Sequence, residues 1–558
     1  MKQPLATKSE KLFSWIFLFL TLGIVAGIFW FNFNGRVFYN CDMYADAFVA
    51  KLMWTEKTLF PENWVFGNQF YIAATPTLAA LMYGILGDSF LALSSASCIM
   101  TIVVLISFIY CMKEAVEKKY IPLGMFCIVG ACIICTGACS DFEGWQILYT
   151  MAGYYAFYLT GILLTMGVWL RFKKYNKVNP IMVIVVFVLN CALGMNSLRQ
   201  TLISCLPLIG FEFLLCLSEM IKKKRCRSVI SDNLKRIMYS TGVLLSNIIG
   251  VILIKLINPN SAPIIEPLKL SYRPGEVFKN LIDTGADIAS ILGFSVYDEG
   301  LNKIPLLIAA AVFLLIVVVS IINILKEKEE TPLTYLIAFS VISLACLVVT
   351  GVFLLRTRDL YYFVWYFLLT CCIIYLAGKL KKRLGIWFLV IVMVFGTTNC
   401  IYSFKNDFVK YQAIHSIYEK IAQELVDDGI EYIYAGVNFN FSVATYSKDK
   451  IIHSIVFWDF EKETGSFCYP VWYIQSSESF EHTNDESAVF AISSNEWQNL
   501  EEKTSAEYVE EFSSCLELYK SFKGEGDEFL YFYYMTEDVI SDFGVIANVE
   551  NPHLNQLY

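Results

Sequence analysis

Long apolar runs alternate with short polar segments over roughly the first 400 residues of the chain. A helix needs about 20 mostly apolar residues to cross the hydrocarbon core of a bilayer. Runs near this length occur at 12–31, 89–111, 121–139, 149–170, 180–195, 201–219, 237–258, 304–325, 332–354, 360–378 and 385–402. The pattern predicts an all-α membrane module with about eleven transmembrane helices over residues 1–404, in which two inter-helix segments, 32–88 and 259–303, are long.

A different pattern begins at residue 405. An amphipathic helical stretch around 408–428 precedes short runs rich in β-branched and aromatic residues at 431–435, 451–457, 488–492 and 529–534, which are typical of strands. About 150 residues can bury a core of their own. We therefore predict that residues 405–558 form a separate soluble α/β domain.

Composition and charge agree with this division. Hydrophobic residues make up 56% of the 558 residues and charged residues only 17%, which indicates a membrane protein. Residues 405–558 hold 28 acidic against 9 basic residues, a net charge of −19, although the whole chain carries only −8. Such an acidic domain is repelled by an anionic membrane surface, and nucleic acid is excluded as a partner because it needs a basic face.

Lysine and arginine collect in every second segment between the predicted helices, beginning with the N-terminal residues. Cytoplasmic loops retain such residues. The distribution predicts a multi-pass plasma-membrane protein whose N-terminus is cytoplasmic. The first apolar run lacks a small-residue cleavage pattern and is predicted to be retained as an anchor. With an odd number of spans, the 405–558 domain and both long loops are extracytoplasmic.

Two carboxylates, Asp42 and Asp46, lie just beyond the first apolar run. On a helix their four-residue spacing places both on one face, where repulsion raises one pKa or a cation binds between them. A second acidic pair, Asp141 and Glu143, is predicted in the next outer loop. The alternative for the first pair is that the acids merely mark where the hydrocarbon ends. For the second pair it is that short outer loops prefer acids because they lack the cytoplasmic basic bias.

Three arginines, Arg199, Arg356 and Arg358, depart from the rule that outer segments are poor in basic residues. A guanidinium binds two phosphate oxygens at once, and a phosphate-bearing lipid head at the outer leaflet would provide them. The alternative is that these side chains extend to ordinary headgroups or pair with Asp359.

Other chemistries find little support. The four histidines lie in the 405–558 domain, so a histidine triad or a histidine zinc site within the membrane module is excluded. The phosphate-binding pattern G-x-x-x-x-G-K-[ST] does not occur, which argues against ATP-driven work. Cys132 and Cys135 lie in an apolar run and are predicted to be packing residues, and a disulfide between Cys468 and Cys515 is left open because spacing does not establish geometry.

The order and sidedness of these motifs resemble the GT-C superfamily of integral-membrane glycosyltransferases, which includes protein O-mannosyltransferases and aminoarabinose transferases. Asp42 matches the acid of the first outer loop, with Asp46 next best, and the stretch from Arg356 to Tyr362 resembles an arginine-tyrosine motif at the outer end of a late span. Segments 59–64 and 429–452 are similar to an uncharacterised bacterial branch. The chain departs from several relatives in having Asp-x-x-x-Asp instead of adjacent acids.

The resemblance implies a GT-C-like arrangement of helices and the inverting transfer of a sugar from a polyprenyl-phosphate donor to an extracytoplasmic acceptor: a cell-envelope glycan, a lipid or a protein. Asp42 or Asp46 would be the base, while Arg199, Arg356, Arg358 and Tyr361 would bind the donor. Asp141 and Glu143 would orient the acceptor or hold a divalent cation such as Mg or Mn through oxygen ligands.

Two alternatives stay open. A transporter or flippase of a lipid-linked saccharide would carry charged residues buried inside its spans, and the sequence pattern predicts spans nearly free of them. The spans also show no internal repeat of the kind found in many transporters. In a non-catalytic envelope assembly subunit, Asp42 and the arginines would be freely replaceable.

Overall fold

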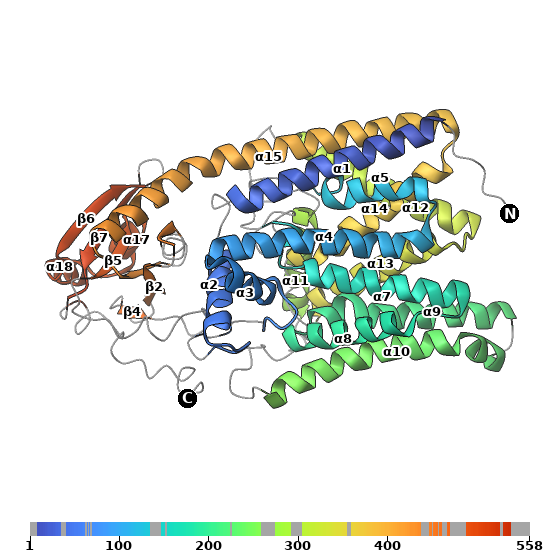
Figure 1. Ribbon diagram of the computed structural model, residues 1–558, viewed down its shortest axis with the longest axis horizontal. Coiled ribbons are helices and arrows are strands. Elements are labelled where there is room, and N and C mark those ends of the chain that lie inside the picture. The colour runs from blue at the N-terminus through green and yellow to red at the C-terminus, as the bar shows by residue number, and fades with distance from the viewer. Residues whose placement is uncertain are drawn as a thin grey trace.

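The computed structural model describes residues 8–34, 41–61, 64, 66, 70–133, 147–150, 153–223, 226–257, 274–291, 304–353, 359–436, 443, 446–448, 450–455, 457–459, 466–468, 487–524, 528–536 and 539. Most of the helices run side by side in one bundle, and a small domain with strands lies at one end of it (Figure 1). We call this the domain end of the bundle and the opposite end, where α1 begins, the far end.

The bundle is built from helices that follow the predicted apolar runs. They are α1 (Lys8–Asn34), α4 (Ser89–Ala115), α5 (Ile121–Phe126) with the π-helical η3 (Cys127–Ala131), α7 (Ala156–Tyr175), α8 (Pro180–Asn196), η4 (Thr201–Cys205) with α9 (Leu206–Lys223), α10 (Cys226–Ile257), α12 (Ile304–Glu327), α13 (Pro332–Phe353), α14 (Val364–Lys379) and α15 (Lys382–Asp427). Within the described residues, eight helices are long and apolar enough to cross a membrane. The predicted all-α membrane module is confirmed, whereas the count of eleven spans stays a prediction.

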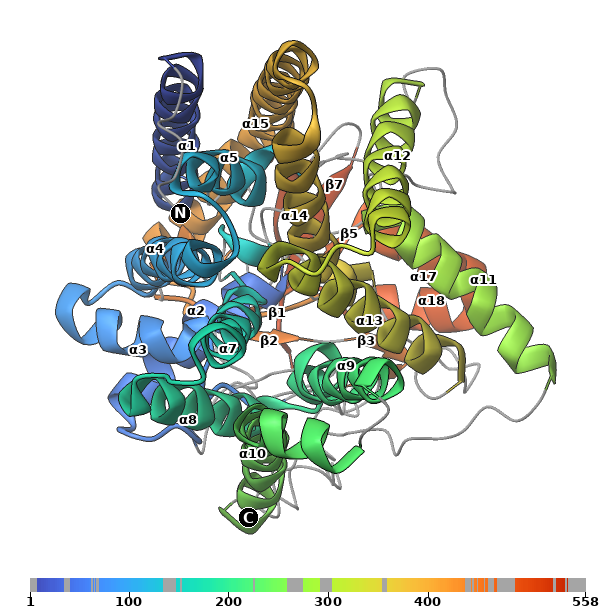
Figure 2. The same cartoon turned by 90° about the vertical axis from the view of Figure 1, so that its right-hand side faces the viewer.

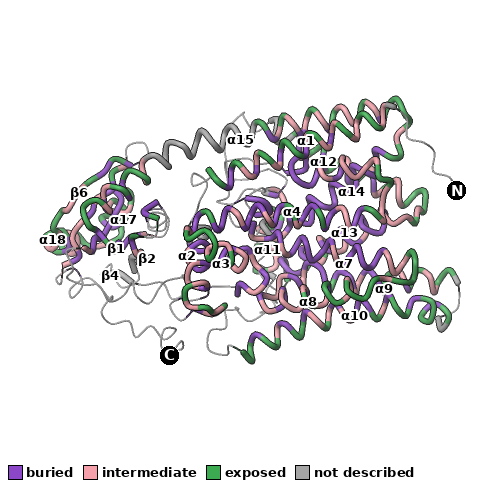
Figure 3. The backbone as a smooth tube through the Cα atoms, viewed as in Figure 1, coloured by how far each residue is buried: buried purple, intermediate pink, exposed green. Residues whose placement is uncertain are grey.

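Burial separates the helices at the centre of the bundle from those at its surface (Figure 3). The apolar window that contains α14 is 89% buried, whereas those of α1, α12 and α15 are 22% buried. Viewed along the bundle, α1, α12 and α15 stand at its periphery (Figure 2). Their exposed side chains, such as Trp15, Phe19 and Trp387, are the apolar surface that a bilayer would cover.

Short helices cover the domain end. In the 32–88 segment, α2 (Cys41–Thr55) and α3 (Thr75–Leu86) pack on each other and on the start of α4. Pro76 lies in the first turn of α3, and Gly87 ends that helix at a φ of 68°, which glycine adopts readily. In the 259–303 segment, α11 (Pro274–Ile291) packs on α13 and on the one-turn helix η6 (Asp359–Phe363).

The C-terminal domain confirms the predicted α/β class. Its five-stranded sheet has the order β2 (Ile452–Ile455), β1 (Tyr432–Ala435), β5 (Ala488–Ser493), β7 (Phe529–Tyr534) and β6 (Leu518–Lys523), and a separate hairpin joins β3 (Phe457–Asp459) to β4 (Ser466–Cys468). The first three strands are parallel and the last two pairings are antiparallel. One apolar core includes the end of α15, and a second includes α17 (Ser494–Lys503) and α18 (Ala506–Ser514).

The link between bundle and domain differs from the expectation. The sequence pattern predicts a helix around 408–428 apart from the apolar run 385–402, but both stretches belong to α15, which runs from Lys382 to Asp427 without interruption. No proline occurs between these residues, so nothing in this stretch forces the helix to end. Gly429, at a φ of 82°, follows the helix and turns the chain into the sheet.

Candidate functional site

The acidic motif lies on a helix, as the four-residue spacing requires. Asp42 and Asp46 are both in α2, so their positions share one face of it. Asp46 is 1% exposed. Its helix neighbours Ala45 and Val49 belong to an apolar cluster that α2, α3 and the segment between them form together. The side chain of Asp42 lies outside the described residues.

Arg199 lies between α8 and η4, where two tyrosines surround its guanidinium. Its Cζ atom is 5.3 Å from the centre of the Tyr361 ring and 6.0 Å from that of Tyr155. The two ring centres are 6.2 Å apart, so both aromatic side chains meet at the same cation. Cation–π contacts of this kind stabilise a charge that is partly removed from water. Because the rings are neutral, they position the guanidinium without cancelling its charge.

Ser197 fixes the backbone next to this cluster. Its hydroxyl lies 3.1 Å from the Tyr158 hydroxyl and accepts a hydrogen bond of 3.3 Å from the Arg199 N–H. Tyr158 also packs on Tyr155, with ring centres 5.9 Å apart. The start of α7 and the end of α8 therefore hold Arg199 jointly.

Asn196, at the end of α8, joins the arginine segment to the 32–88 segment. Its side-chain oxygen accepts hydrogen bonds from the N–H groups of Ile72 and Ala73, at 2.8 and 3.1 Å, and its amide donates one of 2.9 Å to the Ala73 carbonyl. Its own carbonyl accepts a hydrogen bond from the Phe70 N–H. Asn196 is 2% exposed, so these are buried bonds that fix the position of 70–73.

Further contacts place α2 and Arg199 in one region of the domain end. The apolar cluster around α2 also receives Tyr154 and Met195, which are the chain neighbours of Tyr155 and Asn196. Thr75 at the start of α3 donates a hydrogen bond to the Gly153 carbonyl. The helix that carries Asp46 is therefore packed against the same segments that support the arginine.

The structure thus brings together two predicted site residues that are far apart in the sequence, Arg199 and Tyr361, and buries a third, Asp46, in the adjoining cluster. Asp141 and Glu143 lie outside the described residues, as do Arg356 and Arg358. Among the described residues no group of three or more His, Cys, Asp or Glu side chains is placed to hold a metal ion. The divalent cation stays a prediction that depends on the undescribed acids.

Sequence reasoning missed the residues that support this site: Tyr155, Tyr158, Asn196 and Ser197. The signal for the tyrosines was weak, because aromatic residues near a span end are typical of any membrane interface. Asn196 and Ser197 stand directly before Arg199 in the sequence. Their proximity to an unexpected arginine was the available signal.

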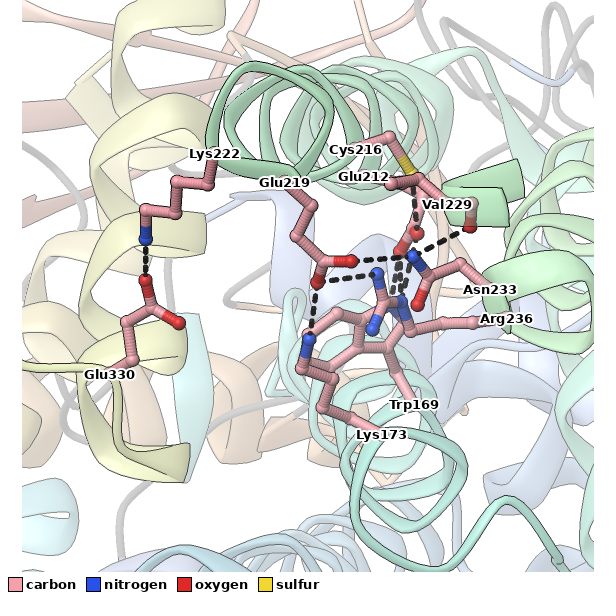
Figure 4. A network of polar contacts seen from close by, with 10 residues as sticks. All are labelled: Trp169, Lys173, Glu212, Cys216, Glu219, Lys222, Val229, Asn233, Arg236 and Glu330. Atoms are coloured by element: carbon pink, nitrogen blue, oxygen red, sulfur yellow. Dashed lines mark hydrogen bonds and ion pairs between the residues drawn. The ribbon is translucent and has the colours of Figure 1, made fainter. Parts of the chain in front are cut away.

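A second polar cluster lies toward the far end and corrects the expectation that the spans are nearly free of charge. Arg236 stands just before the predicted run 237–258, among the basic residues between two runs, but it lies in α10, within the candidate span Ser228–Ile257, and its side chain is 4% exposed. Its Nε atom lies 2.8 and 2.9 Å from the two carboxylate oxygens of Glu212 on α9 (Figure 4). Trp169 on α7 donates a hydrogen bond of 2.8 Å to the same carboxylate.

The cluster continues toward the helix ends. Glu219 accepts hydrogen bonds from Lys173, at 2.8 Å, and from Asn233, at 2.7 Å, and it lies 4.0 Å from an Nη atom of Arg236. Two carboxylates thus face an arginine and a lysine across α7, α9 and α10 (Figure 4). Charges buried in a membrane module are retained only when they are paired in this way.

Comparison with known proteins shows the class of fold. No protein-family model and no curated protein matches the sequence. The structure of ArnT from Cupriavidus metallidurans bound to undecaprenyl phosphate matches with a TM-score of 0.51 and 10% identity, over 95% of this chain and 99% of that one. The apo structure of the same protein matches with a TM-score of 0.48 and 10% identity, over 88% and 93%.

The chain is therefore a polytopic membrane protein with a GT-C-like fold. The particular fold that it shares, bundle and C-terminal domain together, is that of ArnT. The predicted resemblance is confirmed at the level of fold.

Proposed function

We propose that this protein is a membrane glycosyltransferase that moves a sugar from a polyprenyl-phosphate donor to an extracytoplasmic acceptor. The observation that carries the proposal is the match along nearly the full length of both chains to a structure that holds undecaprenyl phosphate. The cluster of Arg199 with Tyr155 and Tyr361 supports it, because a guanidinium held by neutral rings suits a phosphate.

The proposed reaction is an inverting displacement at the anomeric carbon of the donor. The acceptor hydroxyl attacks that carbon, its proton passes to a carboxylate of α2, and the bond to the lipid phosphate oxygen breaks. Asp42 is the first candidate for the base and Asp46 the second. Arg199, with Arg356 or Arg358, stabilises the charge that develops on the departing phosphate, and Tyr361 positions Arg199.

A release assay tests this reaction. Purified protein is incubated with candidate polyprenyl-phosphate sugars and an acceptor fraction from cell envelopes, and free polyprenyl phosphate is measured by mass spectrometry. Asp42→Asn should abolish release while folded protein remains, and Arg199→Gln should reduce it about 100-fold or more. Glu56→Gln, which changes an acid just beyond α2, is the matched control and should keep full activity. Undiminished release by Asp42→Asn would remove Asp42 from the role and leave Asp46 as the candidate.

The proposed orientation has a cytoplasmic N-terminus and an extracytoplasmic C-terminal domain in the plasma membrane. Its support is the charge at the far end of the bundle, where Lys173, Lys174, Lys222 and Lys379 lie in the last turns of their helices. A protease added to intact spheroplasts should remove an epitope at the C-terminus and spare one at the N-terminus. The reverse result would invert the orientation.

A second candidate function is transport or flipping of a lipid-linked saccharide. The buried Glu212 and Arg236 favour it, because ionisable residues inside spans are typical of translocation pathways. In liposomes a transporter would move a fluorescent lipid-linked sugar between leaflets and release no lipid phosphate. The transferase would release lipid phosphate in the same vesicles once an acceptor is supplied. A non-catalytic assembly subunit, the third alternative, would do neither.

A further inference from the structure

A groove at the far end of the bundle has no part in the proposed reaction. It encloses about 340 Å³ and lies between the first turns of α1, the one-turn helix η2 (Lys118–Tyr120), the end of α14 and the first turns of α15. These elements are at the opposite end of the bundle from α2 and the C-terminal domain (Figure 1). Whatever binds in this groove is therefore separate from the candidate active site.

The lining changes from charged to apolar in the same direction on each wall. On α1 it passes from Ser9 and Glu10 to Phe13 and Phe17, on α15 from Lys382 to Ile386 and Leu389, and beside η2 from Glu117 and Lys119 to Leu123. All three walls start at the far end of the bundle. Residues with higher numbers in each wall therefore lie closer to the middle of the bundle. A gradient of this kind matches an amphiphile with a charged head and an apolar tail.

Two tryptophans place the groove at the surface of the bilayer. Trp15 on α1 is 70% exposed and Trp387 on α15 is 61% exposed. At about 1.5 Å per residue, both lie roughly 10 Å or less from the first residue of their helix. Exposed tryptophans near the ends of spans mark the headgroup layer of a membrane. Trp15 stands between Phe13 and Phe17, and Trp387 between Ile386 and Leu389, so the apolar part of the groove is level with the membrane interface. The charged part lies on its aqueous side, where phosphate and ammonium groups of lipids are found.

The charges in the lining balance. Lys119 pairs with Glu10 at 3.0 Å and with Glu117 at 3.1 Å. Lys382 is the second lining cation, and it makes no ion pair within the described residues. Two lysines and two glutamates in one groove complement a head that carries both a phosphate and an ammonium group. Because one lysine, Lys119, stands between two glutamates, this trio keeps a formal net charge of −1, which an ammonium group offsets and a head with only negative charge does not.

We infer that this groove binds a glycerophospholipid whose headgroup is zwitterionic, with a phosphate and a primary ammonium, as in phosphatidylethanolamine. Lys382 takes the phosphate, Glu117 takes the ammonium, and the wall of Phe13, Phe17 and Leu389 receives the start of one acyl chain. The site would hold a structural lipid at the junction of α1 and α15. The inference does not depend on the proposed transferase reaction.

The test is lipid binding to the purified full-length protein, measured by native mass spectrometry with phosphatidylethanolamine and, separately, with phosphatidylglycerol. Lys382→Gln should lower the affinity for phosphatidylethanolamine about fivefold, the effect of one charge-assisted contact near the surface. Lys381→Gln is the matched control, because Lys381 is exposed and does not line the groove. It should leave the affinity unchanged.

Two further variants test the tail and the selectivity. Ser14→Phe places a ring in the groove and should prevent tight binding of either lipid, whereas Glu117→Gln should weaken phosphatidylethanolamine and strengthen phosphatidylglycerol. Equal affinities for the two lipids in the unmodified protein, or equal losses in Lys382→Gln and Lys381→Gln, would overturn the inference. Preferential binding of polyprenyl phosphate at this groove would overturn it as well.

Discussion

The buried pair between Glu212 and Arg236 yields the sharpest stability prediction. The Glu212 carboxylate receives three hydrogen bonds of 2.8 to 2.9 Å, two from Arg236 Nε to its two oxygens and one from Trp169. Two unit charges about 4 Å apart attract by about 4 kcal/mol at an effective dielectric constant of about 20. Glu212→Ala removes this attraction and leaves the guanidinium buried without its carboxylate. We expect a loss of about 3–5 kcal/mol in unfolding free energy.

The assay is thermal unfolding in detergent followed by tryptophan fluorescence, with all variants scanned at one rate because unfolding of such proteins is often irreversible. The matched control is Glu330→Ala. Glu330 pairs with Lys222 (Figure 4), but these side chains are 55% and 61% exposed, so its removal should cost no more than about 1 kcal/mol.

A double replacement distinguishes the attraction between Glu212 and Arg236 from the cost of burying each charge. Replacing both Glu212 and Arg236 by Met fills similar volume without charge and should restore most of the stability, because the desolvation cost disappears together with the attraction. The reasoning is refuted if Glu212→Ala and Glu330→Ala unfold at the same temperature. It is also refuted if the double replacement is less stable than Glu212→Ala.

Three further outcomes are expected. Asn196→Ala removes the three side-chain hydrogen bonds that hold 70–73 and should lower the unfolding free energy by about 2–3 kcal/mol; an unchanged melting temperature would contradict this. Gly250→Ala places a Cβ atom against the backbone carbonyl oxygen of Cys191 in α8, so we expect a cost of about 1–3 kcal/mol. Its control is Gly285→Ala, where no atom lies within 4 Å of the added Cβ, and equal melting temperatures would count against the close packing of α8 and α10. The pKa of Asp428 in the C-terminal domain is lowered, chiefly by a hydrogen bond from Tyr519 and also by Lys520. Its contribution to stability is therefore present above the unfolded-state pKa, near 4, and is lost as the pH falls below it. In acid titrations followed by circular dichroism, Asp428→Asn should lose less stability as the pH falls. A titration curve identical to that of the unmodified protein would show that Asp428 does not contribute to the pH dependence.

The bundle could be predicted because length and hydropathy alone define a spanning helix. Because hydropathy is averaged over a whole run, the same criterion did not reveal the buried charges. Glu212 stands alone between two phenylalanines inside an apolar run, and Arg236 comes one residue before the run that starts at 237. A hydropathy window dilutes a single charge, and only the packing of α9 against α10 shows that these two meet.

The C-terminal strands show a similar limit. The four predicted runs, which are rich in β-branched and aromatic residues, overlap strands β1, β2, β5 and β7, whereas β6 was missed. Its sequence, Leu518–Lys523, includes two lysines, and it lies at the edge of the sheet. Edge strands commonly carry such charges, which makes them resemble loops in sequence.

For the candidate site, separate arguments pointed to Arg199 and to Tyr361, and the structure places these two side chains together. Their meeting could not be derived from the sequence, because it depends on how α7, α8 and η6 converge at the domain end. Tyr155 and Asn196 were missed for the same reason: their roles depend on which residues they contact in the fold, and their residue types alone do not indicate these contacts.

Release of free polyprenyl phosphate is the most direct test of the central claim that an acid of α2 and Arg199 act on one lipid-linked sugar. The protein should release lipid phosphate only when a polyprenyl-phosphate sugar and an acceptor are both present, and Arg199→Gln should reduce release about 100-fold or more. If release is absent with every donor tested, or if Arg199→Gln and the double replacement Asp42→Asn with Asp46→Asn release at the unmodified rate, the transferase account is wrong.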